Sequence, residues 1–227
     1  MLILVDGADP VQIARLWQYY PLDGVTTNPT LIAKEKKEFW GLLKAIQDII
    51  GRDKMLHVQV TGLKGEEMVE EALYLKEKIG GNLYLKIPVI AEGIKAIRIL
   101  KAYSIKVTAT AVFTPMQALM AAKAGADFIA PYVNRLDNIC SDGIGAVEEI
   151  LKIMDLHQFA GRVVAASFKN VEQINRLCLK GVHAVTLNPE LIEQLLFHPM
   201  TDLSVAGFRK DWEDFFGTGQ SISHLEQ

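Results

Sequence analysis

The sequence predicts an α/β protein built as a closed (β/α)8 barrel, the TIM-barrel architecture, and three observations lead to this fold class. Short apolar or β-branched runs alternate with amphipathic segments along the chain, and eight such runs occur. The repeating units are about 20 to 35 residues long, as expected for parallel strands joined by crossover helices. Eight units of this length favour a closed barrel; an open doubly wound sheet is the alternative.

The eight predicted strands are rich in Val, Ile, Leu and Thr and are bounded by Gly, Pro or polar residues. They are LILVD (2–6), GVTT (24–27), MLHVQV (55–60), NLYLKI (82–87), IKVTATA (105–111), DFIAPY (127–132), RVVAAS (162–167) and HAVTL (183–187). Between them apolar residues recur with a helical period, as at Met68, Ala72, Leu75 and Ile79. That spacing predicts helices on the outside of the barrel.

A further helix is expected after the eighth unit, over residues 201–217. Phe208, Trp212, Phe215 and Phe216 are spaced as one apolar face of such a helix. The face requires a cover, which is either the chain's own barrel or a neighbouring subunit. We therefore expect residues 1–227 to form one barrel domain with an added C-terminal helix.

Composition and charge favour a small-molecule partner. The 227-residue chain is 50% hydrophobic and carries a net charge of -3, enough apolar sequence to bury a large core. It has no basic stripe for nucleic acid and no polybasic or membrane-spanning segment. Its two cysteines, Cys140 and Cys178, have no metal-ligand spacing. We expect a cytoplasmic protein with a reducing environment.

One lysine interrupts the apolar run LYLKIPV (83–89). Strand alternation places Leu83, Leu85 and Ile87 on one face and Lys86 on the other, so Lys86 points into the barrel if the first three pack against helices. Burial lowers the pKa of an amine and makes it a nucleophile for ketones and aldehydes. This chemistry is that of a class I aldolase; a lysine that reaches solvent at the rim is the alternative.

Nearly every other strand also places a polar group near its carboxyl end, where barrel enzymes hold their active sites. These groups are Asp6, Thr26, Gln59, Thr108, Thr110, Tyr132, Arg135 and Ser167. Together they include a carboxylate, hydroxyls that could orient a water, and a cation for a phosphate. His57 shares the inward face with Gln59, and packing is its favoured role.

Four segments resemble the transaldolase family, most closely its fructose 6-phosphate aldolase branch. They are GVTTNPTLIA (24–33), LKIPVIAEGIKAI (85–97), TAVFTPMQALMAAKAGADFIAPYVNRLD (110–137) and VVAASFKN (163–170). The resemblance implies a (β/α)8 barrel without metal or cofactor. It also implies an imine between Lys86 and the carbonyl carbon of a ketose or of dihydroxyacetone.

The resemblance assigns a role to each matching position. Lys86 is the imine-forming lysine, and Asp6 is the carboxylate that orients the substrate hydroxyls. Thr26 and Asn28 contact the dihydroxyacetone unit. Arg135 and Ser167 contact the phosphate, which suits a guanidinium fork and a hydroxyl.

Two positions separate aldolases from transaldolases within the family, and both are of the aldolase type here. Transaldolases carry a glutamate in place of Gln59 and typically a phenylalanine in place of Tyr132. Gln59 does not titrate, so Gln59, Thr110 and Tyr132 are expected to hold a water that moves the proton. Such a water favours protonation and hydrolysis of the intermediate, which releases dihydroxyacetone.

The expected function is therefore an aldolase that cleaves fructose 6-phosphate to dihydroxyacetone and glyceraldehyde 3-phosphate, or runs the reverse addition. A transaldolase is the first alternative, and a non-catalytic sugar-phosphate-binding barrel is the second. Gly7, His57 and Thr108 depart from the residues common in relatives and border the donor pocket. The segment FRKDWEDFFG (208–217) resembles a helix that closes a pentamer or decamer, so a homo-oligomer is expected.

Overall fold

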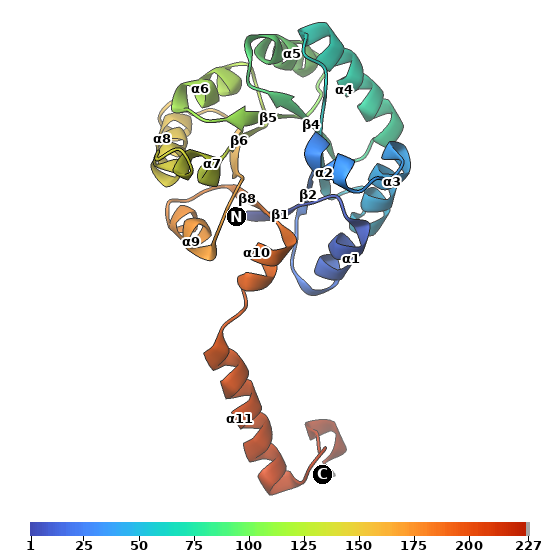
Figure 1. Ribbon diagram of the computed structural model, residues 1–227, viewed down its shortest axis with the longest axis vertical. Helices are drawn as coiled ribbons and strands as arrows, with labels where there is room; N and C mark the ends of the chain where they lie inside the picture. Colours follow the sequence, from blue (N-terminus) through green and yellow to red (C-terminus); the bar gives the residue numbers. More distant parts are fainter. Residues whose placement is uncertain (226–227) are drawn as a thin grey trace. The chain divides into compact units, whose positions relative to one another are not determined.

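The computed structural model, described for residues 1–225, contains a closed barrel of parallel strands in sequential order (Figure 1). The strands are β1 (Leu2–Asp6), β2 (Gly24–Thr26), β3 (Met55–Gln59), β4 (Leu83–Pro88), β5 (Val107–Val112), β6 (Phe128–Pro131), β7 (Arg162–Ala165) and β8 (Ala184–Leu187). β8 pairs with β1 in parallel and closes the sheet. The predicted (β/α)8 fold and its eight strands are confirmed.

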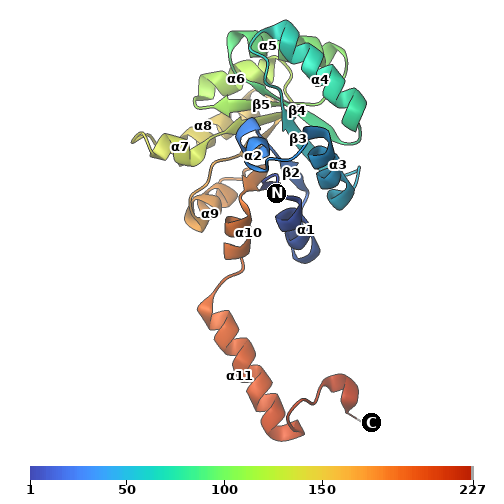
Figure 2. The ribbon, with the colours of Figure 1, turned by 45° about the vertical axis from the view of Figure 1, so that its right-hand side comes forward.

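The helices surround the strands as the crossover rule requires. They are α1 (Pro10–Tyr19), α2 (Pro29–Lys34), α3 (Phe39–Ile50), α4 (Gly65–Ile79), α5 (Ala91–Ala102), α6 (Pro115–Lys123), α7 (Val133–Asp137), α8 (Gly143–Leu156), α9 (Val171–Leu179), α10 (Pro189–Gln194) and α11 (Pro199–Phe216), with a 3₁₀ turn at Ile222–His224. Two connections hold a short helix before the main one, α2 before α3 and α7 before α8. In both ribbon views α2 lies beside β2 and next to α3 (Figures 1 and 2).

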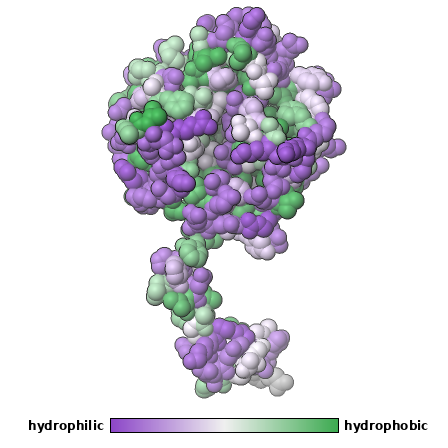
Figure 3. All heavy atoms as spheres, viewed as in Figure 1, coloured by the Kyte–Doolittle hydropathy of each residue, from purple (hydrophilic) through white to green (hydrophobic). Residues whose placement is uncertain are grey.

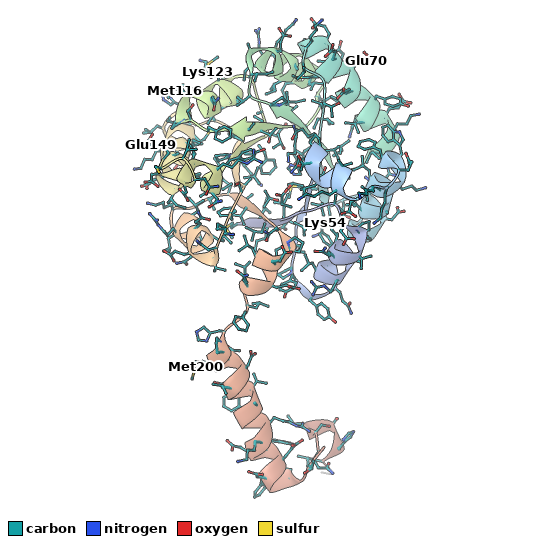
Figure 4. The ribbon with its side chains drawn as sticks, in the orientation of Figure 1. Lys54, Glu70, Met116, Lys123, Glu149 and Met200 are labelled. Atoms are coloured by element: carbon teal, nitrogen blue, oxygen red, sulfur yellow. The ribbon has the colours of Figure 1, made fainter. Side chains whose placement is uncertain are left out.

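Outward-facing strand residues and helix residues form the main core. Leu85, Ile87, Val107 and Ile129 are fully buried between the sheet and the helices, because their side chains alternate with the inward ones. On the outer face, charged residues such as Glu70 of α4 point away from the barrel (Figure 4).

Inside the barrel an apolar layer fills the space below the carboxyl ends of the strands. Its buried members are Leu4, Met55, Phe128, Ala130, Val164 and Ala184, with Leu2 and Tyr84 packed against them. The barrel is thus a packed core up to the level at which the polar strand residues begin. Those polar residues lie above an apolar base.

The chain divides into two compact units, residues 1–192 with the barrel and a C-terminal unit from Glu193 onward. In the second unit α11 (Pro199–Phe216) corresponds to the helix expected at 201–217; it begins two residues earlier and ends one residue earlier, and none of its residues is buried. Trp212 packs on Phe216 with ring centroids 4.2 Å apart, whereas Phe208 and Phe215 are 72% and 81% exposed. Hydrophobic residues along this segment are visible in Figure 3, and Met200 projects from the helix in Figure 4.

Across residues 1–225, the apolar stretch needed for a helix to cross a membrane does not occur.

Candidate active site

A polar cavity of about 130 Å³ lies at the carboxyl ends of the strands. Its lining residues come from seven of the eight strand regions and from the loops that follow them. They are Asp6, Thr26, Asn28, Lys86, Thr108, Thr110, Ala130, Tyr132, Arg135, Val164, Ala166, Ser167 and Thr186. Eight of the nine residues proposed for the site from the sequence are in this set, and Gln59 is not.

Lys86 is buried at the base of this cavity, as strand alternation predicts. Its side chain is 6% exposed, and its Nζ donates a hydrogen bond to the backbone carbonyl of Thr27 at 2.6 Å. Burial lowers the pKa of Lys86 below that of a free lysine, and the nearby Asp6 carboxylate opposes this effect. The amine is therefore more available as the neutral nucleophile than an exposed lysine is.

Asp6 ends a chain of hydroxyl hydrogen bonds at the carboxyl end of β1. Thr26 donates to Asp6 Oδ1 at 2.9 Å, and the Thr26 and Thr186 hydroxyl oxygens lie 2.7 Å apart. Because Thr26 gives its only proton to Asp6, Thr186 must donate to Thr26. Burial raises the pKa of Asp6, while Lys86, the Thr26 hydrogen bond and Arg135 lower it. Asp6 is thus fixed in position and more ready to take up a proton than an exposed aspartate.

Thr110 and Tyr132 meet on the opposite side of the cavity from Asp6 in the strand order. Their hydroxyl oxygens are 3.0 Å apart. Strand β5 has a register shift between Ala109 and Val112, and Ala111 adopts a left-handed backbone with φ of 57°. A bulge of this kind turns the strand end and re-aims its side chains, and bulges are frequent beside active sites.

Arg135 and Ser167 come together because α7 is attached to the end of β7. The amides of Val133 and Asn134 donate to the carbonyls of Ala166 and Ser167 at 2.9 and 2.7 Å. Ser167 itself has a left-handed backbone with φ of 61°, a conformation that costs energy for a non-glycine residue.

The Arg135 guanidinium lies over the Tyr132 ring, 4.7 Å from its centroid. A cation–π contact of this geometry holds the exposed guanidinium at the rim of the cavity. Arg135 and Ser167 therefore present a charged donor and a hydroxyl on one side of the opening, the pair that a phosphate requires.

Asn28 and Gln59 lie toward a second, more apolar pocket of about 400 Å³ beside the first. Asn28 borders both pockets, and its Oδ1 accepts from the amide of Leu31, so it also caps α2. The Cα of Gln59 is in register with that of Lys86, yet Gln59 lines the pocket formed with α2, α3 and α4 and is not among the residues that line the Lys86 cavity. The structure therefore joins Thr110 and Tyr132 but leaves Gln59 apart from them, and its role stays a prediction.

Sequence reasoning missed three polar elements around Lys86. Thr186 was not predicted as a site residue, although strand alternation with Val185 and Leu187 places its side chain on the inward face. The Thr27 carbonyl was not foreseeable, because a backbone acceptor has no residue signature. The third is the hydrogen bond of 2.9 Å between His57 Nδ1 and the Thr108 hydroxyl.

The arrangement combines a buried amine, a positioned carboxyl group, a hydroxyl pair and an anion-binding rim in one small cavity. A buried amine can form an imine with a carbonyl compound, and the neighbouring groups can move protons. Within residues 1–225, no three or more His, Cys, Asp or Glu side chains gather closely enough to hold a metal ion.

Comparison with known proteins agrees with this chemistry. Residues 3–224 match the family described as Transaldolase/Fructose-6-phosphate aldolase. A "Probable transaldolase" of Geotalea daltonii is 40% identical over 213 residues, covering 94% of this chain and 98% of the relative. A "Probable transaldolase 2" of Listeria monocytogenes is 39% identical over 215 residues, covering 95% of this chain and 97% of the relative.

Solved structures share the fold at low sequence identity. One described as "Native KDPGal structure" superposes with a TM-score of 0.56 at 17% identity and covers 94% of both chains. A designed cube-shaped protein cage gives a TM-score of 0.60 at 15% identity, covering 98% of this chain and 80% of the cage chain. The match over nearly the whole sequence and the close relatives together establish that this chain belongs to the transaldolase/fructose-6-phosphate aldolase family.

Proposed function

We propose that this protein is a class I aldolase that cleaves fructose 6-phosphate into dihydroxyacetone and glyceraldehyde 3-phosphate, or catalyses the reverse addition. The observation that carries the proposal is Lys86, a buried amine with a lowered pKa at the base of a polar cavity. No other lysine lines that cavity among the described residues. The roles below follow from this assignment.

The first half of the reaction joins the substrate to Lys86. The neutral amine adds to the ketone carbon of fructose 6-phosphate to give a carbinolamine, which loses water to form a protonated imine. Asp6 holds the substrate hydroxyls and, with its raised pKa, can supply and recover the protons of the dehydration. Arg135 and Ser167 bind the phosphate at the rim.

The second half breaks the carbon–carbon bond. The hydroxyl two carbons from the imine carbon gives its proton to a water held by Thr110 and Tyr132, with Gln59 as the third predicted partner. The bond electrons move onto the imine nitrogen, glyceraldehyde 3-phosphate leaves, and an enamine remains. Protonation of the enamine carbon and hydrolysis of the imine then release dihydroxyacetone and restore Lys86.

A transaldolase is the second candidate, because the relatives at about 40% identity are named probable transaldolases. A transaldolase passes the same enamine to an acceptor such as erythrose 4-phosphate instead of protonating it. The resemblance associates transfer with a titratable glutamate at the position of Gln59. The glutamine found here cannot titrate, and this supports cleavage over transfer. Assaying glyceraldehyde 3-phosphate release with and without erythrose 4-phosphate separates the two, since only cleavage proceeds without the acceptor.

We further propose that the protein forms a homo-oligomer, a pentamer or a decamer, through α11. The proposal is supported by the exposed apolar residues of that helix, including Phe208 and Phe215, because apolar surface of this kind is typical of interfaces. The two free and exposed cysteines support a reducing location such as the cytoplasm. Sedimentation equilibrium of the full chain tests the oligomer, and a monomer at micromolar concentration would contradict it.

A further inference from the structure

We propose that His57 is a positioning residue: its Nδ1–H donates to the Thr108 hydroxyl oxygen, which forces the Thr108 O–H to act as a donor toward the hydroxyl oxygen that dihydroxyacetone carries, and hydroxyacetone lacks, when the ketone is bound at Lys86. This inference rests on the proposed function and adds a determinant of the donor substrate to it. His57 and Thr108 are two of the three positions, with Gly7, that depart from the residues common in relatives, and the structure links these two by a hydrogen bond.

His57 is fully buried inside the barrel, in a tightly packed aromatic setting. Its ring stacks on Tyr84 with centroids 4.6 Å apart and an interplanar angle of 12°. The ring of Phe128 packs against it with centroids 5.5 Å apart. These contacts leave the imidazole little freedom to rotate. The position of Nδ1 beside Thr108 is therefore fixed by packing as well as by the hydrogen bond.

The imidazole is neutral. Burial, together with the smaller effect of the Lys86 charge, lowers the pKa of His57 to about 3. A neutral imidazole carries one proton, on either Nδ1 or Nε2. The hydrogen bond to Thr108 can form with either tautomer, because Nδ1 can donate or accept. The surroundings of Nε2 therefore determine which tautomer is present.

Nε2 is buried and makes no hydrogen bond within the described part of the chain. A proton on Nε2 would leave a buried donor unpaired, which proteins avoid more strictly than an unpaired acceptor. The proton therefore belongs on Nδ1. Thr108 must then accept with its oxygen, and its own proton is free to donate elsewhere.

Thr108 lines the Lys86 cavity, and its Cα is in register with that of Lys86 on the adjacent strand. Within residues 1–225 the hydrogen bond to His57 is the one that the Thr108 side chain makes. Because Thr108 lines the cavity, its O–H is then available to a ligand bound there that offers a lone pair, such as a hydroxyl oxygen. A site built to bond such an oxygen discriminates against a donor that lacks it.

The tautomer can be tested without any assay of activity. Solid-state ¹⁵N NMR of histidine-labelled full-length enzyme, with the His57 signals identified by their loss in His57→Phe, should show a protonated Nδ1 and an unprotonated Nε2. The reverse pattern, or an imidazolium at pH 7, would overturn the proposal. The protonation state is read from the wild-type enzyme, and the variant is needed only to assign the His57 signals.

The effect on the donor is tested by comparing dihydroxyacetone with hydroxyacetone, which has one hydroxyl fewer, in addition to glyceraldehyde 3-phosphate. Thr108→Val should lower the kcat/KM ratio of dihydroxyacetone to hydroxyacetone about tenfold, the value of one hydrogen bond. The matched control Thr108→Ser keeps the hydroxyl and should retain the ratio. An unchanged ratio in Thr108→Val would overturn the proposal.

A double-mutant cycle isolates the contribution of His57. His57→Phe should lower the same ratio, and His57→Phe combined with Thr108→Val should lower it no more than Thr108→Val alone, because His57 acts only through that hydroxyl. Additive losses would overturn the positioning role. A wild-type enzyme with neither activity nor a borohydride adduct would overturn the proposed function instead, while the nitrogen spectrum would still decide the tautomer.

Discussion

Replacing Arg135 with glutamine should separate phosphate recognition from the chemistry at Lys86. Arg135 is exposed at the cavity rim and held over the Tyr132 ring at 4.7 Å. It is close enough to the carboxylate of β1 for its charge to lower the pKa of Asp6. Arg135→Gln removes the charge and the guanidinium fork but keeps a polar side chain that reaches the same region.

The magnitude follows from the hydrogen bonds at stake. A charge-assisted hydrogen bond to a phosphate is worth about 1.5 to 3 kcal/mol, which corresponds to roughly a 10- to 150-fold change in kcat/KM. The addition of dihydroxyacetone to glyceraldehyde 3-phosphate should therefore slow by that factor in Arg135→Gln. Addition to glyceraldehyde, which has no phosphate, should change by less than about threefold, because no bond to a phosphate is lost and Arg135 has the smallest of the effects on the pKa of Asp6.

Lys169→Gln is the matched control, since Lys169 is an exposed cation two residues beyond Ser167. It changes the charge near the rim without removing a group that lines the cavity, so both aldehydes should react within about twofold of wild type. The reasoning would be refuted if Arg135→Gln lowered kcat/KM by the same factor for glyceraldehyde 3-phosphate and for glyceraldehyde.

Three further outcomes are expected. Lys86→Met should be more stable to urea than wild type at pH 7, because burial lowers the pKa of Lys86 and thereby makes the folded state less favourable for the charged amine. The advantage should shrink as the pH rises toward 10, because the unfolded lysine then also loses its proton; an advantage independent of pH would contradict the account. Tyr132→Phe should slow acceptor-free cleavage about 100-fold without reducing the yield of borohydride adduct, and a lost adduct would place Tyr132 in imine formation instead. Phe208→Arg should lower the mass of the oligomer in sedimentation, whereas an unchanged mass would remove Phe208 from the proposed interface.

The sequence predicted the barrel and most of the cavity because both depend on periodicity. Alternation within a strand places Lys86 inward once Leu85 and Ile87 are taken as outward, and the parallel order brings the carboxyl ends together. No such rule describes the side-chain torsions. Gln59 is in register with Lys86 but lines the neighbouring pocket. The direction of its side chain depends on the space left by α2 and α3.

Irregular backbone and hydrogen-bond partners were equally beyond the sequence patterns. Ala111 has a left-handed backbone and interrupts β5. Such a conformation is usually predicted from a glycine, and this position is an alanine. The Thr26 hydroxyl, expected to contact substrate, donates to Asp6, because the two strands are in register at this point. The pairing of His57 with Thr108 required the three-dimensional register of β3, β4 and β5.

The most direct test of the central claim is borohydride reduction in the presence of dihydroxyacetone, followed by peptide mass mapping, with a parallel fructose 6-phosphate cleavage assay that contains no acceptor. We expect one three-carbon adduct on Lys86, loss of that adduct in Lys86→Met, and release of free dihydroxyacetone in the cleavage assay. An adduct without acceptor-free release would replace the aldolase by the transaldolase. An unmodified Lys86 would contradict the imine mechanism altogether.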